Sequence, residues 1–140
     1  MWTYSLVIVL NIQIYSCKPS YRDYIPNGYI VPNPCFSPGV WDAVGHYNPV
    51  HHTLIKNQFG VDYGSEARWS HGLCRMDSDR DNKTNGEELG DPNCDWFTGE
   101  IPTVKPIGHP GICEPVGSPW CIREQGFTCN DLENSANLKP

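Results

Sequence analysis

The chain has 140 residues, a formal net charge of −6, 13 glycines, 13 prolines and seven cysteines. This length suits one domain, and the glycine and proline content predicts long irregular connections between short elements. The acidic balance, without a basic patch, argues against nucleic acid and anionic membrane surfaces as partners.

The first 17 residues are expected to form a secretory signal peptide. Their core is the apolar run LVIVL at residues 6–10, which is too short for a membrane span of about 20 apolar residues. No later segment approaches that length, so no membrane span is expected; the alternative for the N-terminus is a buried strand. We therefore predict a signal over residues 1–17, one secreted, extracellular domain over 18–130 and a flexible tail over 131–140.

Six cysteines remain after removal of this signal, and an even number in a secreted chain is typical of disulfide bonding. They are Cys35, Cys74, Cys94, Cys113, Cys121 and Cys129. The absence of a CxxC pair argues against a zinc ribbon or a thioredoxin-like redox site. Proximity along the chain favours the pairs Cys74–Cys94 and Cys121–Cys129, which leaves Cys35 to pair with Cys113.

The predicted elements are short and few. Prolines spread over residues 18–50 exclude a persistent helix there, and residues 51–63 are expected to form a short helix or a turn. Residues 65–76 are the best helix candidate, because Ser65 can cap it and apolar residues recur at helical spacing. Residues 95–120 are again rich in proline and glycine. The expected fold is small and disulfide-rich, mostly irregular with a few short helices and little β-structure.

The segment DSDRDNKTNGEE, residues 77–88, carries oxygen-bearing side chains at the spacing of a twelve-residue calcium loop. The predicted ligands are Asp77, Asp79, Asp81, the backbone carbonyl of Lys83, Asn85 and Glu88. With the helix expected before it, this loop predicts half of an EF-hand, since Gly90 and Pro92 limit the following helix to one turn. The alternative is a solvated acidic turn.

Two loop positions depart from the usual EF-hand pattern. Position six is Asn82 in place of glycine, and asparagine tolerates the left-handed backbone next best. Position eight is Thr84 in place of an aliphatic residue, and the sequence holds no second loop, so we expect a solitary loop that serves stability rather than sensing. Asn82, Lys83 and Thr84 also form a glycosylation sequon. We expect it to stay unmodified, because a glycan on a tight metal loop would be awkward even on an outward-pointing side chain.

Residues 69–96, WSHGLCRMDSDRDNKTNGEELGDPNCDW, resemble the temptin-like family, and the block TNGEELGDPNC is the specific part. Shorter segments add support: IPNG at 25–28, WDAVGH at 41–46, NQFGVD at 57–62 and HPG at 109–111. The resemblance covers roughly residues 21–113. It implies a secreted, disulfide-bonded, pheromone-like protein with a calcium loop, and it pairs Cys74 with Cys94 and Cys35 with Cys113. The family loop usually reads DSDGDGKTNG, so Arg80 and Asn82 replace two glycines.

Other residues point to weaker alternatives. His46 and His109 could contribute to a copper or zinc site, although no HxxxH or HxH spacing is present and hydrogen-bonded or surface histidines are commoner. The tryptophans are more typical of the core of a small disulfide-bonded protein than of a ligand-stacking face; they include Trp41, Trp69, Trp96 and Trp120. No GxSxG or HExxH motif occurs and every mature cysteine is expected in a disulfide, so we predict no enzyme.

The expected function is a secreted signalling or protein-interaction factor with calcium as a structural ion. The ion would make residues 77–88 rigid and position the face around Trp69 and Trp96 to meet another secreted protein or a cell-surface receptor. One alternative is a matrix- or shell-associated calcium-binding protein, but a mineral surface favours a spread acidic array over six acids in or beside one loop. The other is a copper- or zinc-dependent oxidative protein that uses His46 and His109.

Overall fold

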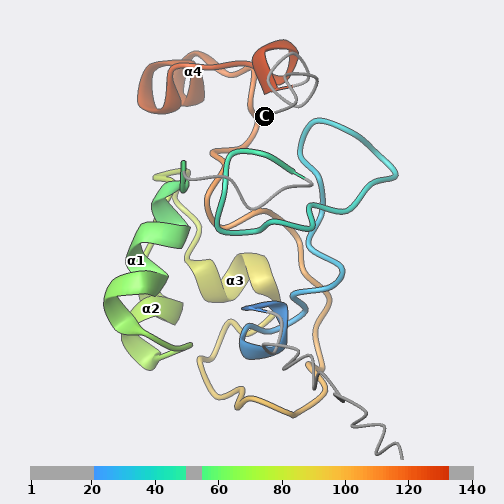
Figure 1. Cartoon of the computed structure of the whole chain (residues 1–140), viewed down its shortest axis with the longest axis vertical. Helices are drawn as coiled ribbons and strands as arrows, with labels where there is room; N and C mark the ends of the chain where they lie inside the picture. Colours follow the sequence, from blue (N-terminus) through green and yellow to red (C-terminus); the bar gives the residue numbers. More distant parts are fainter. Residues whose placement is uncertain (1–20, 50–54, 133–140) are drawn as a thin grey trace, which may run out of the picture.

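The computed structural model describes residues 21–49 and 55–132 (Figure 1). Its named elements are η1 (Tyr21–Tyr24), α1 (Gln58–Glu66), α2 (His71–Arg75), α3 (Asn85–Leu89) and α4 (Pro119–Gln125); residues 129–132 are also helical. The β-structure within these ranges consists of two isolated bridges, Pro32 with Val40 and His46 with Lys56. The prediction of a small, mostly irregular fold with short helices is therefore confirmed. The expected signal peptide and residues 133–140 of the expected tail lie outside the described residues.

The single helix predicted over residues 65–76 is wrong, because the chain breaks it into α1 and α2. Ala67 takes the left-handed conformation (φ 59°) and donates its N–H to Tyr63 O at 2.8 Å, which ends α1. Ser70 then starts α2 by accepting the Leu73 N–H at 3.0 Å. An αL residue followed by a serine N-cap ends one helix and begins another, and apolar spacing alone does not reveal that break.

The apolar side chains form two clusters. The first is built around α1, α2 and α3 and comprises Ile25, Val31, Val44, Phe59, Leu73 and Leu89, with Tyr21, Tyr63 and Trp69 packed against it. The second joins the middle of the chain to its C-terminal part and comprises Trp41, Ile112, Val116 and Leu132, with Cys35, Tyr47, Phe127 and Cys129. Trp41 is fully buried, as a core tryptophan should be, whereas Trp120 is 44% exposed. In Figure 1, α1 and α2 run beside each other, and α4 lies at the opposite end of the molecule from η1.

The six cysteines of the described residues all form disulfide bonds, and the pairing differs from the prediction at two of the three. Cys74 pairs with Cys94 as predicted, but Cys113 pairs with Cys121 and Cys35 pairs with Cys129. Residues 114–118 turn back, so that Cys121 in α4 reaches Cys113. The rest of the chain then returns to the second apolar cluster, where Cys129 meets Cys35. The predicted pairs Cys35–Cys113 and Cys121–Cys129 are therefore wrong, because packing of the C-terminal segment outweighs proximity along the chain.

Within the described ranges, no helix has both the length and the apolar character needed to cross a bilayer.

Candidate metal site

The predicted calcium loop connects α2 to α3, and hydrogen bonds and a disulfide fix both of its ends. Asn85 donates its N–H to Met76 O at 2.7 Å, which closes the loop. Thr84 caps α3 in a capping box with Glu87, whose carboxylate accepts the Thr84 N–H at 2.7 Å. The Cys74–Cys94 disulfide joins α2 to the chain beyond α3. Both helices are only five residues long, so the long incoming helix expected for half of an EF-hand is not present.

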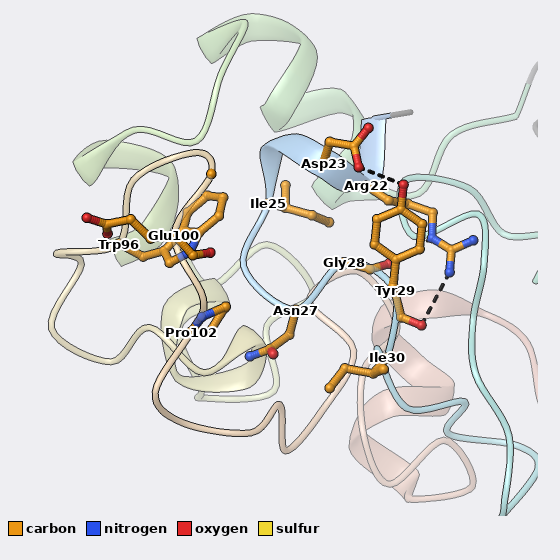
Figure 2. Close-up of a pocket in the computed structure, with 11 residues that line it drawn as sticks. Arg22, Asp23, Ile25, Asn27, Gly28, Tyr29, Ile30, Trp96, Glu100 and Pro102 are labelled. Atoms are coloured by element: carbon orange, nitrogen blue, oxygen red, sulfur yellow. Dashed lines mark hydrogen bonds between the residues drawn. The ribbon is translucent and has the colours of Figure 1, made fainter. Parts of the chain in front are cut away.

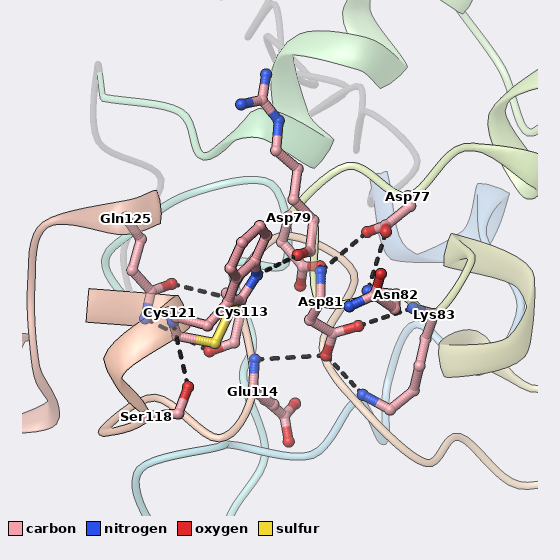
Figure 3. The surroundings of a disulfide bond; sticks show 12 residues. Asp77, Asp79, Asp81, Asn82, Lys83, Cys113, Glu114, Ser118, Cys121 and Gln125 are labelled. Carbon is pink, nitrogen blue, oxygen red and sulfur yellow. Dashed lines mark hydrogen bonds and ion pairs between the residues drawn. A yellow bond between two sulfur atoms is a disulfide. The ribbon is translucent and has the colours of Figure 1, made fainter. Parts of the chain in front are cut away.

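Three aspartates converge inside this loop. Carboxylate oxygens of Asp77, Asp79 and Asp81 lie within 4.8 Å of one another, and within the described ranges this is the only group of three or more potential metal-ligating His, Cys, Asp or Glu residues. Backbone donors hold them in place (Figure 3): Asp77 accepts N–H groups from Asp81 at 3.1 Å and Asn82 at 3.0 Å, and Asp81 accepts the Lys83 N–H at 2.9 Å. The loop therefore turns its acids toward one point, as the spacing predicts.

The tight turn forms without glycine. Arg80 and Asn82 both take left-handed backbone conformations, with φ of 63° and 73°. These are the two positions at which the resembling family carries glycine. A non-glycine residue costs roughly 1–2 kcal/mol in this region, and asparagine tolerates it best. The rest of the loop therefore imposes this backbone on Arg80 in particular.

Glu88, in α3, is a fourth predicted ligand and lies outside this group of three aspartates. It is fully buried, and neither of its carboxylate oxygens has a hydrogen-bond partner in the described part of the chain; the same holds for Oδ2 of Asp79. Burial, followed by the charges of Asp79 and Asp81, raises the pKa of the Glu88 carboxyl far above its usual value. Burial and the charge of Asp81 likewise raise the pKa of Asp79. Buried carboxylates without partners are costly, and a cation among them removes that cost.

The side chains of two further predicted ligands, Lys83 and Asn85, make contacts within the protein. The Lys83 ammonium contacts Asp81 Oδ2 at 2.5 Å, which offsets part of the negative charge, and the ligand role of its backbone carbonyl stays a prediction. The Asn85 amide donates to Leu73 O at 2.8 Å and to Ser78 Oγ at 2.9 Å. Asn85 therefore ties the loop to α2, and its place in the ligand set also stays a prediction.

Residues 113–125 cover one side of the loop, which the sequence did not predict. The Trp120 indole donates to the Arg80 carbonyl at 2.7 Å, and Arg80 pairs with Glu124 at 3.4 Å. Glu114 donates its N–H to Asp81 Oδ2 at 3.4 Å (Figure 3). A cavity of about 200 Å³ between this segment and the loop is lined by Asp79, Arg80 and Glu124, among others. These contacts join residues 33 to 44 positions apart, so no local sequence signal marks them.

Asp91, two residues after the end of α3, connects several segments through hydrogen bonds that the sequence analysis also missed. Its side chain is buried and accepts the Trp69 indole N–H at 2.9 Å and the backbone N–H groups of Asp95 and Trp96 at 2.9 and 3.2 Å. Asn27 donates to both Leu89 O and Val104 O at 2.8 Å. The residues around Trp69 and Trp96 are therefore anchored to the end of α3, one residue past the expected end of the metal loop.

Trp96 borders an open apolar cavity of about 290 Å³, which lies between residues 22–30 and residues 96–102 (Figure 2). Tyr29 and Trp96 face it from opposite sides, and the Arg22 guanidinium lies 4.2 Å from the centre of the Tyr29 ring. Nearby, Phe97 and Ile101 are 71% and 90% exposed. Exposed apolar side chains that follow one another closely in the sequence make this segment a candidate interaction surface.

The described part of the chain adds no support for a metal site at the histidine pair, which stays a prediction. His109 is fully buried, its ring lies 4.8 Å from that of Trp41, and its Nδ1 accepts the Gly111 N–H at 3.1 Å. Neither His46 nor His109 belongs to a group of three or more metal-ligating side chains there. His51 and His52 lie outside the described residues, so the copper or zinc alternative gains no support.

Burial lowers the pKa of His109 to about 3 from an ordinary value of 6.5. The neutral ring is therefore kept in the folded state, while the unfolded chain takes up a proton below pH 6.5. Its contribution to stability is present above pH 6.5 and falls as the pH drops toward 3, by about 2 kcal/mol between pH 7 and pH 5. Urea unfolding of calcium-saturated protein at both pH values should show a smaller loss for His109→Gln than for the wild type.

The control for this experiment is His71→Gln, at an exposed histidine of α2, which should keep the wild-type pH dependence. NMR titration of the wild-type histidine rings gives a second reading that needs no variant to fold. Titration of the His109 ring between pH 7 and pH 5 would contradict the buried neutral state.

Comparison with known proteins gives two matches. A family model described as Temptin C-terminal matches residues 15–112. The chain is also 41% identical over 111 residues to Temptin from Aplysia californica. The matched region covers 78% of this chain and 88% of that protein. No solved structure matches the chain significantly. The family model ends before Cys113, so α4 and the segment that covers the loop lie beyond it.

Proposed function

The chain belongs to the temptin family, and on that basis we propose that it is a secreted, pheromone-like signalling or protein-interaction factor with one structural calcium ion. Family membership, the disulfide-rich fold and the expected signal peptide support secretion. The partner is another secreted protein or a cell-surface receptor.

The observation that carries the calcium proposal is the buried Glu88 carboxylate, which lacks a partner and faces the charges of Asp79 and Asp81. Calcium prefers carboxylate and carbonyl oxygens in flexible geometry. The ligands would be the side chains of Asp77, Asp79, Asp81 and Glu88, together with the Lys83 carbonyl. The ion would neutralise charge that Lys83 alone does not balance, and it would hold α3 against the loop.

The role of this ion is structural. The loop is solitary in the sequence. The helices on either side have only five residues each, which is too short for the change in interhelical angle that opens a calmodulin-type sensor. The end of α3 instead leads into Asp91, which holds Trp69 and Trp96. Calcium would therefore fix the position of the apolar face beside Phe97 and Ile101, and this face would meet the partner.

Calcium titration of metal-free protein tests the ion directly. Isothermal calorimetry should give one site per chain, and Glu88→Gln should weaken binding by at least tenfold because it removes a buried charged ligand. The matched control is Glu87→Gln: Glu87 is exposed, and glutamine serves equally well at this capping-box position. Equal affinities for the two variants would contradict the assigned ligand set.

The interaction face has its own test, which uses capture of proteins from native secretions on calcium-loaded protein. Ile101→Asp should abolish capture of whatever the wild type retains, because a charge on the apolar face opposes its burial. Ile122→Asp is the control, since Ile122 is also exposed (43%) but lies on α4. Loss of capture with Ile122→Asp, but not with Ile101→Asp, would move the face to α4.

A further inference from the structure

We propose that Asn82 carries an N-linked glycan in the secreted protein, attached to the calcium loop without disturbing its ligands. Asn82, Lys83 and Thr84 form the only Asn-X-Ser/Thr triplet in the sequence. The inference rests on the proposed secretion, because the glycan is added in the secretory pathway. It reverses the expectation from sequence that a tight metal loop leaves no place for a glycan.

The loop uses the backbone of Asn82 but not its side chain. The Asn82 N–H donates to Asp77 Oδ2 at 3.0 Å, and its left-handed φ of 73° shapes the turn. Asn82 is exposed, and its amide makes no hydrogen bond to any residue that the structure describes. A sugar on Nδ2 therefore breaks no contact, and every proposed ligand oxygen belongs to another residue.

The neighbouring side chains leave this position open. Arg80 is the other exposed residue within 77–84, and it is directed to α4, where it pairs with Glu124. Lys83 turns inward to Asp81. Asn82 is thus the one exposed side chain of residues 77–84 that has no partner in the described structure, which is where a bulky, hydrated group is accommodated.

The transfer must precede folding of α3. Nδ2 of Asn82 forms a bond to C1 of the first sugar of a lipid-pyrophosphate-linked oligosaccharide; the C1–O bond to phosphate breaks, the lipid pyrophosphate leaves, and the amide gives up a proton. The enzyme also reads the hydroxyl of the third residue. In the folded loop, Thr84 Oγ1 accepts the Glu87 N–H at 3.2 Å and donates to Glu87 Oε2 at 3.0 Å, so only the unfolded chain presents it.

Expression of the full chain in eukaryotic cells, followed by intact mass of protein from the medium, tests the inference. Thr84→Ser keeps both the sequon and the cap, so this variant and the wild type should each exceed the mass calculated from the sequence by one glycan. A glycan-removing amidase should release this glycan and leave Asp at position 82. Thr84→Asp keeps a capping side chain without the sequon, and Asn82→Gly keeps the left-handed turn without the acceptor. Both variants should be secreted at their unmodified mass.

The outcomes separate this inference from the proposed function. Secreted wild-type protein without a glycan overturns the inference and leaves the function standing. No secretion of the wild type or of any variant contradicts the proposed function itself. The calcium affinity of the glycosylated wild type should lie within threefold of that of Asn82→Gly. A glycosylated protein that binds calcium more than tenfold weaker overturns the placement of the glycan outside the ligand set.

Discussion

Calcium is expected to stabilise the wild type, and the effect of Glu88→Gln on stability is expected to change sign with the ion: the variant should be less stable than the wild type in calcium and more stable in chelator. Calcium at 100 times its dissociation constant should stabilise the wild type by about 2.7 kcal/mol, which raises its melting temperature by about 10 °C for a domain of this size. In chelator at neutral pH, Glu88→Gln should be more stable than the wild type by about 1–3 kcal/mol, because it removes a buried carboxylate without a partner. Differential scanning calorimetry in calcium and in chelator measures both effects.

The crossing of these two effects is diagnostic. Substitution of a residue that only packs would destabilise the protein both in calcium and in chelator. Substitution of a charged ligand destabilises the protein only when the ion is present. Glu87→Gln should follow the wild type in both buffers, because the capping box accepts glutamine. Identical melting of the wild type in calcium and in chelator would refute the structural ion.

Removal of the Cys35–Cys129 disulfide is expected to destabilise the protein more than removal of Cys113–Cys121. The first joins residues 94 positions apart and the second residues 8 apart. In the chain-entropy model these loops correspond to about 4.7 and about 2.6 kcal/mol. Urea unfolding of the two double-alanine variants, with all other conditions equal, measures the difference.

Peptide mapping of the non-reduced protein supports this comparison. Chymotrypsin cleaves after Trp120, which separates Cys113 from Cys121, so their disulfide should join two peptides that neighbour each other in the sequence. A linked pair containing Cys35 and Cys113 would instead support the pairing expected from the sequence. Equal destabilisation by the two double variants would also contradict the entropic argument.

The convergence of the three loop aspartates could be predicted from the sequence because the information for it is local. Asp77, Asp79 and Asp81 converge through backbone hydrogen bonds that reach at most five residues along the chain. The Cys74–Cys94 pair brackets the same short unit, so proximity identified it correctly. What the spacing did not reveal is that Glu88 is completely buried and without a partner, since burial depends on what the rest of the chain places around α3.

The failed predictions share one cause, which is that packing between distant segments decided them. The return of the C-terminal segment to Trp41 set the pairing of Cys35, and no residue near Cys35 indicates it. The helix break at Ala67 depends on a left-handed alanine, a conformation that alanine rarely adopts. Asp91 has no motif of its own; its importance comes from three donors that the fold brings to it.

The Cys35–Cys129 bond also determines how the protein responds to proteolysis. A single cut anywhere between these two residues yields two fragments that remain covalently joined through the sulfur atoms. The irregular segment that contains the exposed Ile101 lies inside this range, where extracellular proteases would attack first. A nicked molecule therefore stays one particle, and its fragments separate only after reduction.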